Sequence, residues 1–264
     1  MATITDTSFF QRFAIQRRVL HALMMREVIT RFGRDNLGVL WLVGEPMIFT
    51  LGVATLWTMS GLNHSSGVPI VAIAVTGYSS VLMWRNSASR CGSAIEQNKP
   101  LLYHRSVQTI DVFLTRIALE IGGATASFIV LSSFFIYIGW MRAPVDILLV
   151  LTGWLMLAWF GASLALLIGG GTALSPIVER IWHPAAYLLF PMSGAAFMVD
   201  WLPQNLQRIV LLLPMVHGVE ILRQGYFGNV VRSHYDISYM AVSCLVLSLM
   251  GLYIVRQAAK RVEF

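Results

Sequence analysis

Residues 147–178 read ILLVLTGWLMLAWFGASLALLIGGGTALSPIV, and this stretch decides the fold class. It contains no Asp, Glu, Lys or Arg. A helix that crosses a bilayer needs about 20 mostly apolar residues, because the hydrocarbon core is about 30 Å thick and each residue rises about 1.5 Å. The stretch is long enough to cross, so we expect a membrane-spanning helix at residues 147–172.

The composition of the whole chain agrees with a membrane protein. Of its 264 residues, 56% are hydrophobic and 12% are charged, whereas a soluble domain carries about 25% charged residues. We expect an all-α integral membrane domain over residues 1–264, with kinks at Pro184 and Pro191 because proline removes helix hydrogen bonds. Six transmembrane helices are predicted, at residues 37–60, 68–84, 117–141, 147–172, 181–199 and 237–255.

The distribution of basic residues predicts the orientation. Lys and Arg gather in the N-terminal segment, in the connection at residues 86–112 and at the C-terminus. Because cytoplasmic loops carry an excess of Lys and Arg, both termini are expected in the cytoplasm. The net charge of +6 then suits anionic membrane lipid rather than nucleic acid, which we do not expect as a partner.

The N-terminal segment, residues 1–35, does not fit a simple span. On a helical wheel its apolar side chains share one face and several arginines lie off it, which is typical of an amphipathic helix at the membrane interface. The alternative is a basic leader that only sets the topology. The apolar face consists of Phe9, Phe13, Leu20, Leu23 and Met24.

A second exception is the outer segment at residues 200–234, between spans five and six. Its apolar run 209–216 is too short to cross and is broken by Pro214. Short re-entrant helices are therefore expected on the outer side, resting against protein or lining a watery cavity. The polar residues His217, Glu220 and Arg223 recur at a spacing of three and share a helical face, so they either border the exit path or pair internally.

Several chemistries have no signature in the sequence. There is no G-x-x-x-x-G-K-[S/T] motif, so the chain is not expected to bind ATP or act as an enzyme. The run Gly169–Gly171 lacks the lysine of such a loop and is expected to serve close helix packing. No H-E-x-x-H or paired C-x-x-C occurs, and Cys91 and Cys244 stand far apart, so no metal site is predicted.

Three stretches of the sequence resemble a known family. The first is REVITRF at 26–32, followed by NLGVLW at 36–41 and by Glu45-Pro46; the second is EQNKPLL at 96–102. The third comprises SPIVERIWHP at 175–184, PMSG at 191–194, VDWLP at 199–203, LPMVHGVE at 213–220 and RQGYFG at 223–228. Together they resemble permease subunits of type-2 ABC exporters.

The third stretch looks most like the capsular polysaccharide export permeases of the KpsM type. The first two stretches are shared with exporters of O-antigen and teichoic acid, so they indicate only the superfamily. The usual family form of the first is R-Y-x-x-S-x-L-G-x-L-W, and Phe32 and Asn36 stand here in place of the tyrosine and the serine.

The resemblance implies a coupling helix within the cytoplasmic loop 86–112. In the family this helix docks into a groove of the ATPase subunit; the alternative is a solvated loop that contains a proline. The coupling residues would be Glu96, Gln97, Asn98, Lys99, Pro100, Leu101 and Leu102. A cytoplasmic interface or gate would be formed by Arg26, Arg31, Arg34, Trp41, Glu179 and Arg180.

Aromatic residues are candidates for a polysaccharide path, because sugars stack their apolar faces on aromatic rings. The alternative is a belt at the membrane interface, where Trp and Tyr gather in any case. The candidate path comprises Trp57, Tyr78, Trp84, Trp154, Trp159, Tyr187, His217, Glu220 and Arg223, with Trp41 as a further aromatic candidate at the gate.

The resemblance predicts a homodimeric channel that carries a lipid-linked acidic capsular polysaccharide outward across a bacterial inner membrane. Two copies of a separate P-loop ATPase would bind ATP and magnesium, and a periplasmic adaptor would continue the route. The alternatives are export of another glycan, such as O-antigen or teichoic acid, and a polytopic membrane transferase. Against a transferase stands the lack of a carboxylate pair or His/Asp cluster in a loop, and a passive channel lacks a filter motif.

Overall fold

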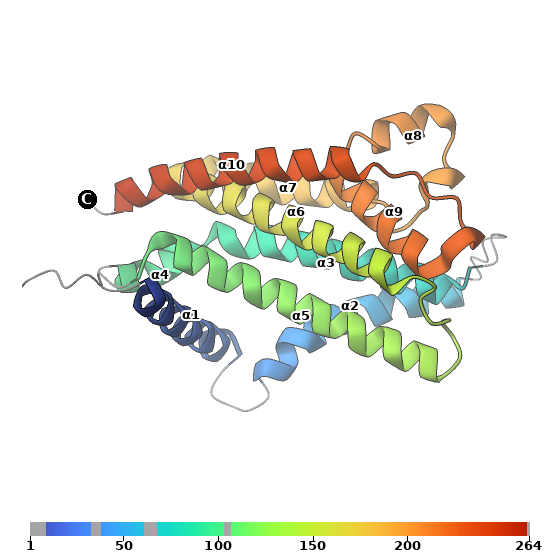
Figure 1. Ribbon diagram of the computed structural model, residues 1–264, viewed down its shortest axis with the longest axis horizontal. Coiled ribbons are helices and arrows are strands. Elements are labelled where there is room, and N and C mark those ends of the chain that lie inside the picture. Colours follow the sequence, from blue (N-terminus) through green and yellow to red (C-terminus); the bar gives the residue numbers. More distant parts are fainter. Residues whose placement is uncertain (1–8, 33–37, 61–67, 103–106, 263–264) are drawn as a thin grey trace, which may run out of the picture.

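The computed structural model describes residues 9–32, 38–60, 68–102 and 107–262, and all the regular secondary structure among these residues is helical (Figure 1). The expected all-α class is confirmed for them. The α-helices are α1 (Phe9–Phe32), α2 (Gly38–Met59), α3 (Ile70–Gly92), α4 (Ala94–Leu102), α5 (Thr109–Tyr137), α6 (Ile147–Leu174), α7 (Pro176–Met192), α8 (Gln204–Val210), α9 (Pro214–Phe227) and α10 (Ile237–Val262). Two 3-10 helices, η1 (Val199–Trp201) and η2 (Gly228–Val230), lie beside α8 and α9.

Four helices among the described residues are long and apolar enough to cross a membrane: α5, α6, residues 40–59 of α2 and residues 237–261 of α10. Helix α8 and residues 214–230 form a pair bent by 107°, which would add a fifth crossing if counted as one span. The other two predicted spans do not meet the same test. Helix α7 has 17 residues, and α3 carries Arg85 and Arg90 in its second half.

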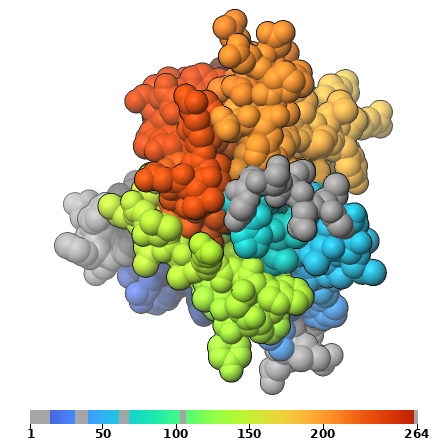
Figure 2. Space-filling model, turned by 90° about the vertical axis from the view of Figure 1, so that its right-hand side faces the viewer, coloured from blue at the N-terminus to red at the C-terminus, as the bar shows by residue number. Residues whose placement is uncertain are grey.

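The long helices run side by side along the molecule, with α6 at the centre (Figure 1). Helix α6 packs against α3, α7, α9 and α10, and its buried side chains join the main hydrophobic core. We call one end of the bundle the α4 end, where α1, α4 and the last turns of α10 lie. The opposite end, the α9 end, is covered by α8, α9, the α9–α10 connection and the α5–α6 connection (Figure 2).

Glycines along α6 let its neighbours approach closely. A Cβ atom on Gly153 would come within 2.5 Å of the backbone nitrogen of Leu222 in α9. A Cβ atom on Gly161 would come within 2.9 Å of the Cα atom of Trp84 in α3. Cβ atoms on the run Gly169–Gly171 would likewise meet α3, α5, α7 and α10 within 3.1 Å. The predicted role of this run in helix packing is confirmed.

Gly153→Ala should destabilise the protein, because the new methyl group would meet backbone atoms of α9. Overpacking of a tight interior costs about 1–3 kcal/mol. Gly122→Ala in α5 is the matched control, since no neighbouring atom lies within 4 Å of its Cβ position and alanine is the better helix former by about 1 kcal/mol. Thermal unfolding of the detergent-purified variants measures both changes. Equal melting temperatures for the two variants would contradict the close approach of α6 and α9.

Helices α3 and α5 extend further than their predicted spans. Helix α3 ends at Gly92 rather than at residue 84, and α5 begins at Thr109 rather than at residue 117. Their polar extensions are held by specific contacts: Asp111 forms a capping box with Gln108 at the start of α5. Hydropathy identifies only the apolar part of each helix, so it does not predict these polar extensions. At its other end α5 stops at Tyr137, before the predicted residue 141.

Helix α7 spans residues 176–192 rather than 181–199 and contains both Pro184 and Pro191. It ends where Gly194 takes a positive φ of 81°, a conformation that helices cannot continue and that glycine adopts without strain. The carbonyl groups that follow the helix turn toward α9 and accept hydrogen bonds there. The predicted end of this span was therefore seven residues too late.

Helix α1 matches the predicted interface helix in position, although part of its predicted apolar face lies outside the described side chains. It packs against α5 and α2 at the α4 end. In Figure 1 helix α1 is strongly foreshortened, so its axis makes a large angle with the axes of the long helices. Leu23 is buried and Leu20 and Met24 are half-buried, whereas Arg17 and Arg18 are exposed. The side chains of Phe9 and Phe13 lie outside the described part.

Candidate functional site

Helix α4, the predicted coupling helix, presents two distinct sides. Asn98 is buried and donates to the carbonyl of Ala94 one turn earlier. Leu101 and Leu102 are half-buried, and Leu102 packs against the core cluster at the α4 end. The remaining predicted coupling residues, Glu96, Gln97, Lys99 and Pro100, are exposed. One side of α4 is therefore fixed to the bundle and the other is open to a partner.

Arg116 of α5 lies at the centre of a polar network beneath α4. Its Nε atom is 2.9 Å from the carboxylate of Glu27 in α1, and both side chains are buried. Its two terminal nitrogens donate to the carbonyl of Arg90 at 2.5 Å and to the side-chain oxygen of Gln97 at 2.5 Å. A single guanidinium group thus joins α1, α3, α4 and α5.

Further polar contacts link α1 and α2 to this network. Arg26 donates to the side-chain oxygen of Asn98 at 2.6 Å, so α1 holds α4 directly. One terminal nitrogen of Arg90, Nη2, donates to both carboxylate oxygens of Glu45 in α2, at 3.0 and 3.1 Å. Gln16 of α1 donates to Asp111 of α5. A movement of α4 would therefore be transmitted through these contacts to α1, α2 and α5.

The predicted gate residues have different surroundings. Arg26 belongs to the network, and Trp41 is 51% exposed near the start of α2. Glu179 is half-buried and Arg180 exposed in the first turn of α7, at the α4 end. Arg31 lies in α1 with its side chain outside the described part, and Arg34 lies outside the described residues. A shared gate remains a prediction.

Sequence reasoning missed Glu27, Glu45, Arg90 and Arg116 as parts of this site. Glu27 lies inside the first resembling motif, and Arg116 directly precedes the predicted third span. The position of a charged residue directly beside an apolar span could have identified Arg116 as a candidate for a buried ion pair. Their pairing could not be read from the chain, because 89 positions separate Glu27 from Arg116 (116 minus 27).

Two of the predicted path aromatics, Trp57 and Tyr78, meet where α2, α3 and α7 come together. The ring of Tyr78 in α3 lies 5.4 Å from that of Trp57 in α2 and 5.3 Å from that of Phe190 in α7. Phe49 of α2 joins them at 5.8 Å from Tyr78. Tyr187, one turn before Phe190, is 67% exposed. We call Phe49, Trp57, Tyr78, Tyr187 and Phe190 the aromatic face.

The other three predicted path tryptophans lie between helices elsewhere. Trp84 is fully buried and packs edge-on against Phe160 of α6. Trp154 stacks on Phe128 at 4.5 Å and donates to Thr125. Trp159 donates to Ser248 of α10. These contacts give each of the three a packing role in the bundle, and the structure does not bring them to the aromatic face.

At the α9 end, the predicted polar face of α9 is buried. Glu220 accepts hydrogen bonds from the backbone N–H groups of Val199 at 3.3 Å and His234 at 3.0 Å. Arg223 donates to the carbonyls of Gly194, Ala195 and Phe197 at 2.7, 2.8 and 2.5 Å. The two side chains therefore hydrogen-bond to different backbone groups, while their opposite charges also attract each other. Arg223 holds the segment that follows α7.

His217 is also engaged with the backbone. Its Nδ1 atom accepts from the N–H of Asp236 at 2.9 Å, and Nε2 donates to the carbonyl of Leu211 at 2.8 Å. The imidazole thus joins the start of α9 to the segments before and after it. Of the two alternatives for His217, Glu220 and Arg223, the geometry favours internal binding, and contact with substrate remains a prediction.

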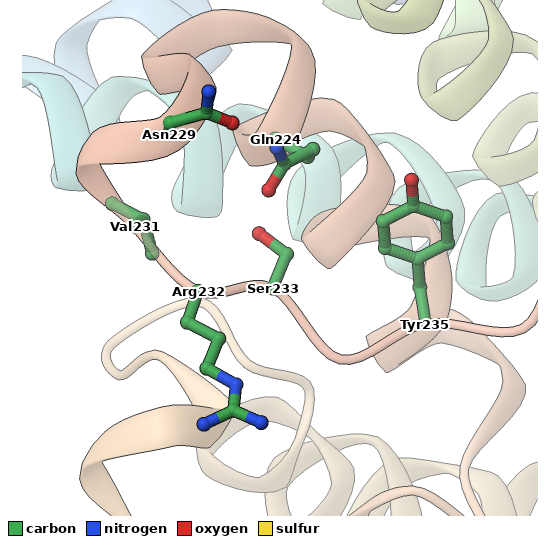
Figure 3. Close-up of a pocket in the computed structure, with 6 residues that line it drawn as sticks. All are labelled: Gln224, Asn229, Val231, Arg232, Ser233 and Tyr235. Carbon is green, nitrogen blue, oxygen red and sulfur yellow. The ribbon is translucent and has the colours of Figure 1, made fainter.

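An open polar pocket of about 470 Å³ lies at the same end, after α9 (Figure 3). It is lined by Gln224, Asn229, Val231, Arg232, Ser233 and Tyr235. Gln224 and Ser233 point toward each other across it, while the guanidinium of Arg232 points away from both. The pocket therefore offers neutral hydrogen-bonding groups but no converging charge.

Known proteins resemble the chain over nearly its whole length. The ABC-2 type transporter family matches residues 18–227. The capsule polysaccharide export inner-membrane protein CtrC of Neisseria meningitidis serogroup B is 42% identical, covering 100% of this chain and 99% of that protein. The capsule polysaccharide export inner-membrane protein BexB of Haemophilus influenzae is 40% identical, covering 98% and 97%.

A more distant relative supports the same assignment. The polysialic acid transport protein KpsM of Escherichia coli is 24% identical over 92% of this chain and 95% of its own length. The resemblance stated from the sequence motifs is thereby confirmed. The chain belongs to the ABC-2 type transporter family, in the group that includes the capsule polysaccharide export inner-membrane proteins.

Proposed function

We propose that the chain is the channel-forming permease subunit of an exporter that moves lipid-linked acidic capsular polysaccharide outward across the bacterial inner membrane. The observation that carries the proposal is the aromatic face, which gathers rings from three helices on one side of the bundle. Sugar rings stack on such surfaces. The names of the relatives supply the class of polymer.

A homodimer would convert the aromatic face into a passage. Helices α2 and α7 flank the face and expose many apolar side chains, which need lipid or protein as a neighbour. A second copy placed against them would enclose the rings of both subunits. The exposed apolar residues are Leu40, Trp41, Ile48, Phe49, Leu56 and Met59 of α2, and Ile177, Ile181, Tyr187, Leu188 and Met192 of α7.

The open side of α4 is the proposed docking site for the partner ATPase, which would bind ATP and magnesium. A membrane subunit without an ATP site must receive its motion through a rigid contact. The Arg116 network supports this role, because it joins α4 to α1, α3 and α5 through buried groups. A periplasmic adaptor would meet the opposite, α9 end.

Both termini and α4 are proposed to lie in the cytoplasm, with the six long helices α2, α3, α5, α6, α7 and α10 as spans and residues 200–234 as the outer re-entrant segment. The structure brings the basic residues of α1, α4 and the last turn of α10 to one end of the bundle (Figure 1). This clustering supports a cytoplasmic α4 end by the positive-inside rule.

A labelling experiment tests this orientation. A cysteine at exposed Ala143 should react with a membrane-impermeant maleimide added to intact spheroplasts, whereas a cysteine at exposed Glu96 should react only after lysis. The two native cysteines, Cys91 and Cys244, are buried and should give little background. Labelling of the parent protein, which has only these two cysteines, measures that background. Labelling of the Glu96→Cys variant in intact spheroplasts would overturn the orientation.

The function itself is tested by deletion and by transport in vitro. Loss of the gene should remove surface capsule and leave polymer inside the cell. The purified permease with its ATPase in lipid vesicles should move preformed lipid-linked polymer in the presence of ATP. A polytopic transferase would instead lengthen or transfer the glycan in these vesicles, and capsule at the normal surface level after deletion would contradict the proposal.

A further inference from the structure

The guanidinium group of Arg85 lies beside the aromatic face, at the middle of the bundle. Its central carbon is 5.2 Å from the ring centre of Tyr187 and 5.5 Å from that of Phe190, both in α7. Cations are attracted to aromatic ring faces, so the two rings hold the arginine in place. Neither ring neutralises its charge.

The depth of Arg85 in the bundle follows from its neighbour Trp84. The Cα atom of Trp84 packs against Gly161, which is at the midpoint of α6, Ile147–Leu174. The stretch 147–178 has no charged residue, so in the proposed topology the middle of α6 lies within the apolar part of the membrane. A charge at that depth is costly and is normally retained where it faces a partner or a watery passage.

Three other arginines of the described helices have partners within the protein. Arg116 pairs with Glu27, Arg90 pairs with Glu45, and Arg223 binds backbone carbonyls. Among the residues that the structure describes, no carboxylate forms an ion pair with Arg85. Its fixed positive charge is therefore available to an anion from outside the chain.

Arg85 also lines a groove of about 340 Å³ between α2 and α3. Phe49 of the aromatic face and Asn86 line the same groove, so apolar ring, amide and cation face one space. Glu45 also lines the groove, and its carboxylate is paired with Arg90. The volume lies in the range of about 300–1,000 Å³ found for small-ligand sites.

We infer that Arg85 and this groove bind an anionic group of the exported glycan, a carboxylate or a phosphate, while the aromatic face holds the sugar rings beside it. The inference rests on the proposed function and adds a residue that selects acidic polymers. The guanidinium fork donates hydrogen bonds to such oxygens in a bidentate manner. The anion would supply the charge partner that Arg85 lacks among the described residues and lower the cost of its half-buried charge.

Three variants separate binding from packing. Arg85→Met keeps the bulk and the contact with the rings but removes the charge, Arg85→Gln keeps hydrogen bonding only, and Arg85→Lys keeps the charge. Arg208→Gln, at an exposed position in α8, is the control for the loss of one positive charge. Each is purified as the full chain with its ATPase in nanodiscs, and co-purification of the ATPase shows that the fold is intact.

The probes are a sialic acid oligomer, the same oligomer with its carboxyl groups reduced to alcohols, and lysophosphatidylglycerol. Arg85→Met and Arg85→Gln should bind the acidic oligomer about tenfold to a hundredfold more weakly, the effect of losing charge-assisted hydrogen bonds. The affinity of Arg85→Lys for the acidic oligomer should lie between that of these two variants and that of the parent. The reduced oligomer should bind to all variants with the same affinity. If only lysophosphatidylglycerol loses affinity, the anion is the phosphate of the lipid anchor.

Parental affinity of Arg85→Met and Arg85→Gln for all three probes would overturn the inference. So would equal losses for the acidic and the reduced oligomer, which would show that Arg85 serves packing only. These results leave the proposed function in place if the parent complex still exports polymer. Failure of the parent complex to export would instead contradict the proposed function.

Discussion

Replacing both Lys99 and Pro100 with glutamate should release the ATPase and lower capsule export by about tenfold or more, because unfavourable charge at an interface costs several kcal/mol. Both side chains are exposed on the open side of α4. The buried contacts of Asn98 with Arg26 and Ala94 are not touched by the change, so the permease should still insert and fold. Capsule at the cell surface and co-purified ATPase are the two readouts.

The matched control for this prediction is Lys260→Glu, which introduces a negative charge at an exposed position in the last turn of α10. This position lies at the same end of the bundle but is not part of α4. It should export and bind the ATPase as the parent does. Normal export by the Lys99→Glu, Pro100→Glu double variant would show that α4 is not the coupling helix, and a loss in both variants would indicate a general effect of charge.

Arg223→Met should be the most destabilising single substitution at the α9 end. Methionine fills much of the same volume but leaves the carbonyls of Gly194, Ala195 and Phe197 without donors. Each buried group left unpaired costs about 1–3 kcal/mol, and breaking a buried charged network costs about 3–5 kcal/mol. The melting temperature in detergent and the yield of inserted protein should both fall sharply.

The double reversal Glu220→Arg, Arg223→Glu tests whether charge neutralisation or hydrogen bonding to the backbone is the main contribution of these two residues to stability. If the two residues only neutralised each other, exchanging them would restore stability. In the structure Glu220 accepts from backbone N–H groups and Arg223 donates to backbone carbonyls. Reversal would place a donor against donors and an acceptor against acceptors, so the double variant should be no more stable than Arg223→Met. Recovery of the parental melting temperature would contradict this geometry.

Much of the fold could be predicted from local sequence. The absence of charge over residues 147–178 was sufficient to predict α6, and the predicted and observed starts of the helix coincide at Ile147. Likewise, α2 lies within one residue of its predicted span at both ends, and α10 begins at the predicted residue, Ile237. A span is a local property, because each backbone group in a helix bonds within its own segment and the lipid requires a continuous apolar run.

The ends of the helices depended on distant residues. The polar first turns of α5 contain Arg116, which pairs with Glu27 of α1. Helix α7 ends at Met192, and the carbonyls that follow it bind Arg223 of α9. Hydropathy cannot reveal such partners. Similarly, Trp57 and Trp84 are equally plausible path residues in the sequence, yet only Trp57 joins the aromatic face.

The sequence by itself therefore determined the class of the protein, its apolar helices and its family motifs, since these depend on neighbouring residues along one chain. Only the tertiary structure decided which charges are matched. It pairs Arg116 and Arg90 with carboxylates and gives Arg223 its carbonyls, whereas Arg85 faces two rings and a groove. The physical reason is that burial makes an unmatched charge costly, and the matching groups come from helices far apart in the sequence.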